Sequence, residues 1–275
     1  MADQEEQLKE LENAILDGHR ERILELAKRL QTRVSDLDDQ LLVATGFLEA
    51  GAPVKALEML QPLVAISANT EQTELLKVRI AEALYATGNP QAALESLKTV
   101  TSRGVQEASD REYFTGLCCD HLGDRVLANA HFSMATELDP DRSPAIPMIS
   151  TEEAQSIVEE VIQELPDSLR QPLEEVPILI EDLPHLDLIQ ETEGEIHPDT
   201  LGLYTGVSLQ DRSHLDADDF THMQTTAAIR IYRRNLERIS QDQEELRNEI
   251  RITLLHEFGH HLGLDEDEVD RLGLS

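Results

Sequence analysis

The sequence predicts an α+β protein overall, in which an all-α array of helical hairpins precedes a small α+β domain. Three observations predict this class: glycines that recur at near-constant spacing in the first half, a proline-rich stretch near the middle, and mixed helix and strand patterns in the second half. We therefore expect a helical-hairpin domain over residues 1–142, a linker over 143–150 and a second domain over 151–275.

The recurring glycines each separate two amphipathic helical stretches. Gly18, Gly51, Gly88 and Gly123 lie 33, 37 and 35 residues apart. A glycine can end a helix in a left-handed cap, where a side chain would be strained. An alanine stands five positions after each of the last three glycines, and such a small residue lets neighbouring helices approach closely. We expect a helical hairpin around each glycine.

This pattern resembles the tetratricopeptide repeat, most closely in residues 109–142. The residues on the small, aromatic and terminal-proline positions of that motif are Gly116, Gly123, Ala128, Phe132, Ala135 and Pro140. The resemblance implies a short superhelix whose concave face binds a peptide or a partner protein. The array could instead bind a segment of its own chain, or form a plain bundle of hairpins. Pro140, Pro144 and Pro147 then forbid a continuing helix and predict the linker.

Composition excludes several classes of function. Acidic residues number 55 against 23 basic ones, for a net charge of −32. Such a chain cannot neutralise a run of phosphates, which excludes a general nucleic-acid binder, and it argues against docking on anionic membranes. The adjacent Cys118 and Cys119 are poorly placed for a structural disulfide. We expect a cytoplasmic protein with no nucleic-acid and no membrane partner.

Patterns in the second domain predict two helices and two strands. Apolar residues at helical spacing predict a helix over 151–165, and a β-branched run predicts a strand over 176–182. Residues 183–200 are acidic and proline-punctuated, so we expect a loop. Residues 201–208 have glycines where a chain bends or backbones approach closely. Alternation over 228–233 predicts a half-exposed strand, and Asp242 with Glu245 predicts a capping box that opens a helix to about Leu262.

The final predicted helix contains the pattern H-E-x-x-H at residues 256–260. Residues four apart share a helix face, so His256 and His260 can present two imidazole nitrogens to one Zn²⁺ ion. Glu257 then lies beside the open coordination position, where it can take a proton from a metal-bound water and pass it to the leaving amine. His261 points away from the pair. We expect it either in the hydrophobic core or in contact with the metal ligands without binding the metal itself.

A tetrahedral site with one open position needs a third protein ligand. Residues 262–275 follow His261 and leave no second helix to donate a distant glutamate. The ligand is therefore expected in the acidic run 265–268 or upstream. Glu266 lies six residues past His260, in the spacing H-E-x-x-H-x-x-G-x-x-ligand, and is the first candidate. Asp265, Asp267 and Glu268 are also close enough to serve as the ligand.

Residues 151–275 also resemble the small bacterial zincin-like metallopeptidases, which have a minimal zincin fold. The matching segments are residues 176–182, 201–206, 229–234 and 245–263. The resemblance implies zinc at His256 and His260, Glu257 as general base and an acidic third ligand just past Gly263. It also implies an edge strand that pairs with extended substrate, a role that suits residues 229–233.

Together these features predict a zinc-dependent metallopeptidase that hydrolyses peptide bonds with a metal-activated water. Its helical repeats would recruit a peptide or protein substrate, or a partner protein. The alternative is a non-catalytic adaptor of the tetratricopeptide type with a structural or vestigial zinc site. Glu257 favours the enzyme, because a purely structural site has no use for a base at that position.

Overall fold

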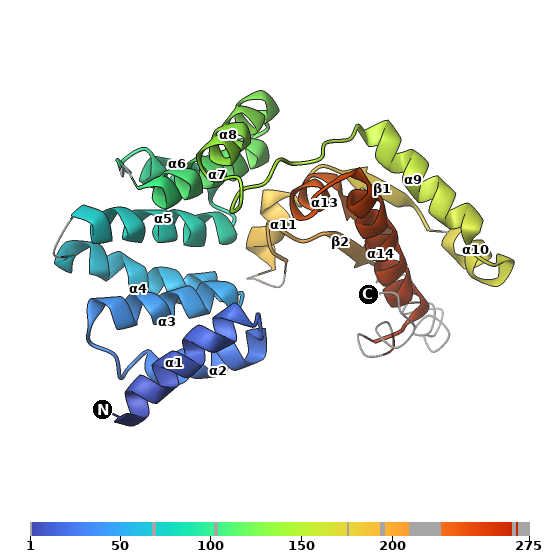
Figure 1. Ribbon diagram of the computed structural model, residues 1–275. Coiled ribbons are helices and arrows are strands. Elements are labelled where there is room, and N and C mark those ends of the chain that lie inside the picture. The colour runs from blue at the N-terminus through green and yellow to red at the C-terminus, as the bar shows by residue number, and fades with distance from the viewer. Residues whose placement is uncertain are drawn as a thin grey trace. The chain divides into compact units, whose positions relative to one another are not determined.

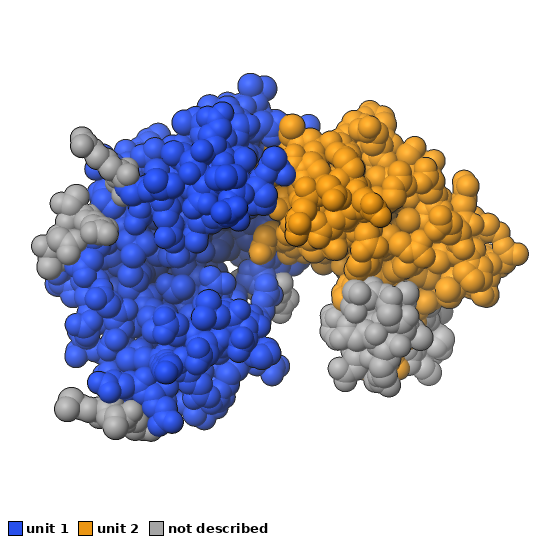
Figure 2. Space-filling view, viewed as in Figure 1, with its two compact units in different colours: residues 1–145, 185–198 blue, residues 146–184, 199–275 orange. Residues whose placement is uncertain are grey.

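The structure is a computed structural model that describes residues 2–67, 70–101, 104–174, 176–192, 196–208, 227–265 and 268. An all-α part precedes a part with a small sheet, which confirms the predicted α+β class (Figure 1). The chain divides into two compact units (Figure 2): unit 1 comprises residues 1–145 and 185–198, and unit 2 comprises residues 146–184 and 199–275. None of the helices in the described ranges is both long and apolar enough to cross a membrane.

Unit 1 is built from helical hairpins, four of them within the described residues. The hairpins are α1 (Ala2–Leu16) with α2 (Arg20–Leu30), α3 (Leu37–Glu49) with α4 (Pro53–Ile66), α5 (Thr70–Ala86) with α6 (Pro90–Leu97), and α7 (Val105–His121) with α8 (Arg125–Leu138) (Figure 1). The predicted glycine at each turn adopts the left-handed conformation, with φ of 69°, 74°, 74° and 85° at Gly18, Gly51, Gly88 and Gly123. The expected glycine turns are confirmed.

Small residues lie where the helices of this array meet. Ala56, Ala93 and Ala128 are fully buried. A Cβ atom at Gly116 would lie 2.7 Å from Phe132 Cε1, so the glycine lets the ring on α8 pack against α7. Cys118 is also buried here, and burial raises the pKa of its thiol to about 12. The thiol therefore stays protonated and unreactive at neutral pH.

Unit 2 places helices beside a three-stranded sheet. Its elements are α9 (Thr151–Glu164), α10 (Asp167–Glu174), β1 (Ile178–Glu181), β2 (Gly202–Thr205), β3 (Ala228–Tyr232), α13 (Arg233–Ile239) and α14 (Gln243–Leu262). The strand order is β1-β3-β2, with β1 parallel and β2 antiparallel to β3. Ile229 and Ile231 of β3 are buried in the same core as Leu254 and Phe258 of α14. The helix expected over 151–165 and the strand expected within 176–182 are confirmed.

The strand expected at residues 228–233 is confirmed as β3, but the expectations that it is half-exposed and that residues 229–233 form an edge are wrong. Strand β3 lies between β1 and β2, and four of its five residues are buried. The alternation was misleading because its polar member, Arg230, finds partners inside the sheet. Its guanidinium donates to Thr205 of β2 at 2.8 Å and lies 3.3 Å from the Glu181 carboxylate of β1.

The loop expected over residues 183–200 contains a helix, α11 (Leu186–Glu191), and residues 185–198 belong to unit 1. Ile189 of α11 is only 3% exposed. The acidic composition of the segment hid the buried side chain of Ile189, through which the helix packs.

A buried ionic cluster joins three segments of unit 2. The Glu237 carboxylate is fully buried and accepts hydrogen bonds from Arg233 and Arg234 of the same helix. Arg233 also donates to the Asp182 carboxylate after β1 and to the Ile149 carbonyl before α9. The Ile149 amide in turn donates to Glu237 Oε1 at 3.1 Å. The cluster therefore fixes the segment ahead of α9 against α13.

Candidate metal centre and active site

Helix α14 carries the predicted metal ligands, and local sequence determines both of its ends. The Asp242 carboxylate caps the N-terminus by accepting from the amides of Glu244 and Glu245, each at 2.9 Å. The Glu245 carboxylate accepts from the Gln241 amide at 2.6 Å, one residue earlier than a standard capping box requires. Gly263 ends the helix with a φ of 93°. The expected helix is confirmed.

His256 and His260 lie one turn apart and direct ring nitrogens to the same point. Their Nε2 atoms are 3.1 Å apart, and the rings meet edge to face with centroids 4.7 Å apart. Two imidazole nitrogens bound tetrahedrally to one zinc ion at 2.0–2.1 Å would be about 3.3 Å apart. The pair therefore fits two of the four positions around a zinc ion.

The predicted third ligand, Glu266, lies outside the described residues, as does Asp267. Asp265 and Glu268, which are described, bind each other. The Asp265 amide donates to Glu268 Oε2 at 3.0 Å, and the Glu268 amide donates to Asp265 Oδ1 at 2.9 Å. The described part of the chain contains no group of three His, Cys, Asp or Glu side chains with a metal-binding arrangement.

Glu257 is 8% exposed, and strand β2 orients its carboxylate. The Tyr204 amide donates to Glu257 Oε2 at 2.6 Å. A Cβ atom at Gly202 would lie 2.8 Å from Glu257 Cγ and 2.9 Å from Oε1. Glycine at this position therefore lets the strand approach the carboxylate closely enough for the Tyr204 amide to bind it.

The Tyr204 amide belongs to the outer edge of β2. The Tyr232 amide of β3 donates to the Leu201 carbonyl at 2.8 Å. Backbone groups alternate in direction along an antiparallel strand, so Gly202 and Tyr204 direct theirs away from β3. Among the described strands it is β2, and not residues 229–233, that presents an outer edge beside Glu257. The sequence signalled this region through the family resemblance of residues 201–206 and through the glycines of residues 201–208, neither of which identified Glu257 as the partner of the strand.

The Tyr204 hydroxyl ties β2 to the end of α14. It donates to the Val207 carbonyl at 2.9 Å, so it accepts from His261 Nδ1 at 3.1 Å, which assigns a proton to that nitrogen. His261 is 1% exposed, in the core position expected of it. Tyr232 is fully buried, and burial raises the pKa of its phenol to about 12.

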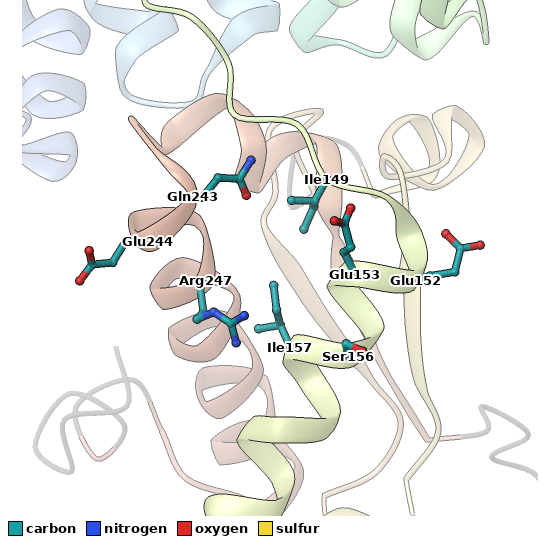
Figure 3. Close-up of a pocket in the computed structure, with 8 residues that line it drawn as sticks. All are labelled: Ile149, Glu152, Glu153, Ser156, Ile157, Gln243, Glu244 and Arg247. Atoms are coloured by element: carbon teal, nitrogen blue, oxygen red, sulfur yellow. The ribbon is translucent and has the colours of Figure 1, made fainter.

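A cavity of about 580 Å³ lies between the N-terminal parts of α9 and α14 (Figure 3). It is lined by Ile149, Glu152, Glu153, Ser156, Ile157, Gln243, Glu244 and Arg247. About 13 Å of helix rise separates Arg247 from His256. The cavity is therefore distinct from the histidine pair and contributes no group to it.

Comparison with known proteins agrees with this geometry. Residues 173–274 match the model of a family described as zincin-like metallopeptidase. The match includes all three strands and the whole of α14, and it begins after α9. No curated protein sequence matches the chain.

Proposed function

We propose that the chain is a zinc-dependent metallopeptidase that hydrolyses peptide bonds in a peptide or protein substrate. The observation that carries the proposal is the 3.1 Å approach of the His256 and His260 Nε2 atoms on the helix that also carries Glu257. A structural site would not need an adjacent carboxylate held by a strand amide. The match of residues 173–274 to a zincin-like metallopeptidase family supports the same activity.

His256, His260 and Glu266 would hold the zinc ion. A bound zinc ion supplies a water of lowered pKa and polarises the scissile carbonyl. The hydrogen bond from the Tyr204 amide holds the Glu257 carboxylate in place through Oε2. We assign to this carboxylate the removal of a proton from the attacking water and its delivery to the leaving amine.

The outer edge of β2 would bind extended substrate. Gly202 N–H and C=O and the Tyr204 C=O point to this edge by strand alternation, and main-chain pairing gives affinity without demanding a side-chain sequence. The Tyr204 N–H is already taken by Glu257. A substrate strand paired here lies next to the base, which is the placement that hydrolysis requires.

The helical array would recruit the substrate or a partner protein. A groove of about 410 Å³ lies among α6, α7 and α8. Its lining combines apolar Leu94, Leu97 and Leu127 with charged Lys98, Arg111 and Glu112. Arg111 and Glu112 pair with each other, so the lining suits mainly the apolar side chains of a peptide.

Metal content tests the proposal. The purified full chain should hold about one zinc ion, and His256→Ala with His260→Ala should remove it, because two of three protein ligands are lost. His19→Ala, at an exposed histidine outside the site, is the matched control and should keep the metal. Equal zinc content in the wild type and the double variant would refute the site. Zinc binding without cleavage of any unfolded protein would favour the adaptor.

A further inference from the structure

The turns of the helical array are not equivalent. A Cβ atom at Gly18 or Gly123 would meet no heavy atom of the described residues within 4 Å. At the two inner turns, it would meet the segment 185–198, which connects β1 to β2 of unit 2 but packs in unit 1. All four glycines have a similar positive φ, so the contact and not the backbone distinguishes the inner turns.

The contact at Gly88 combines packing with a hydrogen bond. The Cβ position would be 3.2 Å from Ile189 Cγ2, and the Ile189 side chain is 3% exposed. The Gln190 side-chain amide donates to the Gly88 carbonyl at 2.7 Å. A bare glycine backbone thus supplies both a flat surface for the isoleucine and an acceptor for the glutamine.

The second contact lies one hairpin away. The Cβ position of Gly51 would be 3.2 Å from His197 Nε2. The short helix α11 begins with His185 as its N-cap, and His197, six residues after its last residue, lies at the Gly51 turn. The segment therefore spans two successive hairpins, in the way that a peptide ligand binds a repeat array.

Charge does not explain this docking. Residues 183–200 contain five acidic and no basic residues, and the whole chain has a net charge of −32. Shape and the Gln190 hydrogen bond must outweigh the repulsion. The covalent connection favours binding of the segment to the array, because a tethered segment has an effective concentration in the millimolar range.

We propose that the Gly51 and Gly88 turns form a peptide-binding surface of the array and that its ligand is the described part of the segment from the same chain, residues 185–192 and 196–198. The array thereby holds in place part of the chain that connects β1 to β2. This inference goes beyond the proposed peptidase activity and does not depend on it.

Amide hydrogen exchange of residues 186–192 in the full chain tests the proposal. In Ile189→Asp with Gln190→Ala, exchange should rise at least ~tenfold, because the segment loses its anchor and opens locally. Glu191→Gln, at an exposed position of the same helix, should leave the exchange unchanged. Unchanged exchange in the double variant would overturn the proposal.

A pair of glycine variants separates docking from folding of α11 itself. Gly88→Ala and Gly123→Ala place the same side chain at φ of 74° and 85° and so cause similar backbone strain. Only the first crowds Ile189 and Gln190, at 3.2 and 3.1 Å. Exchange of residues 186–192 should therefore rise in Gly88→Ala and stay at the wild-type level in Gly123→Ala. The same exchange in both variants would overturn the proposal.

Discussion

Gly202 determines how closely strand β2 approaches the helix that carries Glu257. A Cβ atom there would lie 2.6 Å from Thr253 Cγ2 and 2.8 Å from Glu257 Cγ. Both distances are too short for a side chain, and Thr253 is 6% exposed, so neither neighbour can move into solvent. The distance between the strand and the base thus depends on the absence of one methyl group.

We expect Gly202→Ala to lower peptide hydrolysis by about 10²-fold, because a displacement of about 1 Å at a catalytic group has that effect. Zinc content should not change, since the histidine pair lies on α14 and not on β2. Leu203→Ala, whose side chain points to the opposite face of the strand, should keep activity within a few-fold of the wild type. Rates and zinc content of the two variants are to be measured side by side. Wild-type activity in Gly202→Ala would show that β2 does not orient the base.

The shared helix face of the proposed ligands His256 and His260 was predictable from sequence, whereas the groups that hold the Glu257 carboxylate were not. The four-residue spacing of His256 and His260 places both on one helix face, and this conclusion needs only the local periodicity of a helix. The contact between Tyr204 and Glu257 joins residues 53 positions apart. No local sequence pattern predicts a contact over such a separation. The donor is also a backbone amide, which every residue type except proline has, so the residue type does not identify it.

The helices and strands also differed in how well the sequence predicted them. Helices α9 and α14 have long periodic patterns and side-chain caps, at Ser150 and Asp242, so their ends followed from sequence. Strand β2 has four residues, one of them glycine, which is too short for a pattern to stand out. Strand β3 alternates like an edge strand although it is central, because its polar residue Arg230 is only partly buried and pairs with Glu181 of the neighbouring strand β1.

A buried ion pair also links the helices of the last hairpin. Glu112 of α7 is 5% exposed and accepts from His131 of α8 at 2.6 Å and from Arg111 at 2.6 Å. Burial acts to raise the pKa of Glu112, but the hydrogen bonds from His131 and Arg111 outweigh it and lower the pKa below its ordinary value of 4.5. The carboxylate therefore stabilises the array in its charged form.

The sign of the resulting pH dependence follows from this lowered pKa. The contribution of Glu112 to the free energy of unfolding is complete above its unfolded pKa and is lost as the pH falls through its folded pKa. Glu112→Gln should therefore cost about 1–3 kcal/mol at pH 7 and much less below the folded pKa. Glu58→Gln, at an exposed position, is the control. Denaturant unfolding at several pH values measures the difference, and a cost independent of pH would contradict this account.

At the scale of the whole molecule, the chain crosses between its units more than once. The sequence predicted two consecutive domains, but residues 185–198 pack in unit 1 although they connect two strands of unit 2. Composition could not show this, because the docking depends on the buried Ile189 and on glycine turns about 100 and 150 residues away. Domain boundaries predicted from the linker alone therefore assign residues 185–198 to the second domain.

The ionic cluster around Glu237 predicts where unit 2 can be separated from the array. A fragment of residues 146–275 keeps the Ile149 carbonyl and amide that bind Arg233 and Glu237, whereas a fragment of residues 151–275 loses both. We expect the longer fragment to be soluble and to bind zinc, and the shorter one to melt at a lower temperature. Thermal unfolding of the two fragments compares them. Equal melting temperatures would show that the contacts of Ile149 with the cluster do not stabilise unit 2. Loss of zinc from the longer fragment would show that unit 2 needs the array to bind the metal.

The central claim is that Glu257 acts as a general base at a metal site formed by His256 and His260. Glu257→Gln keeps the size and shape of the side chain but removes its ability to accept a proton. The direct measurement is zinc content together with cleavage of an unfolded protein, for this variant, the wild type and the exposed control Glu244→Gln. We predict full zinc content in all three and a loss of cleavage of roughly 10²–10⁴-fold in Glu257→Gln alone. Cleavage by Glu257→Gln at the wild-type rate would contradict the account.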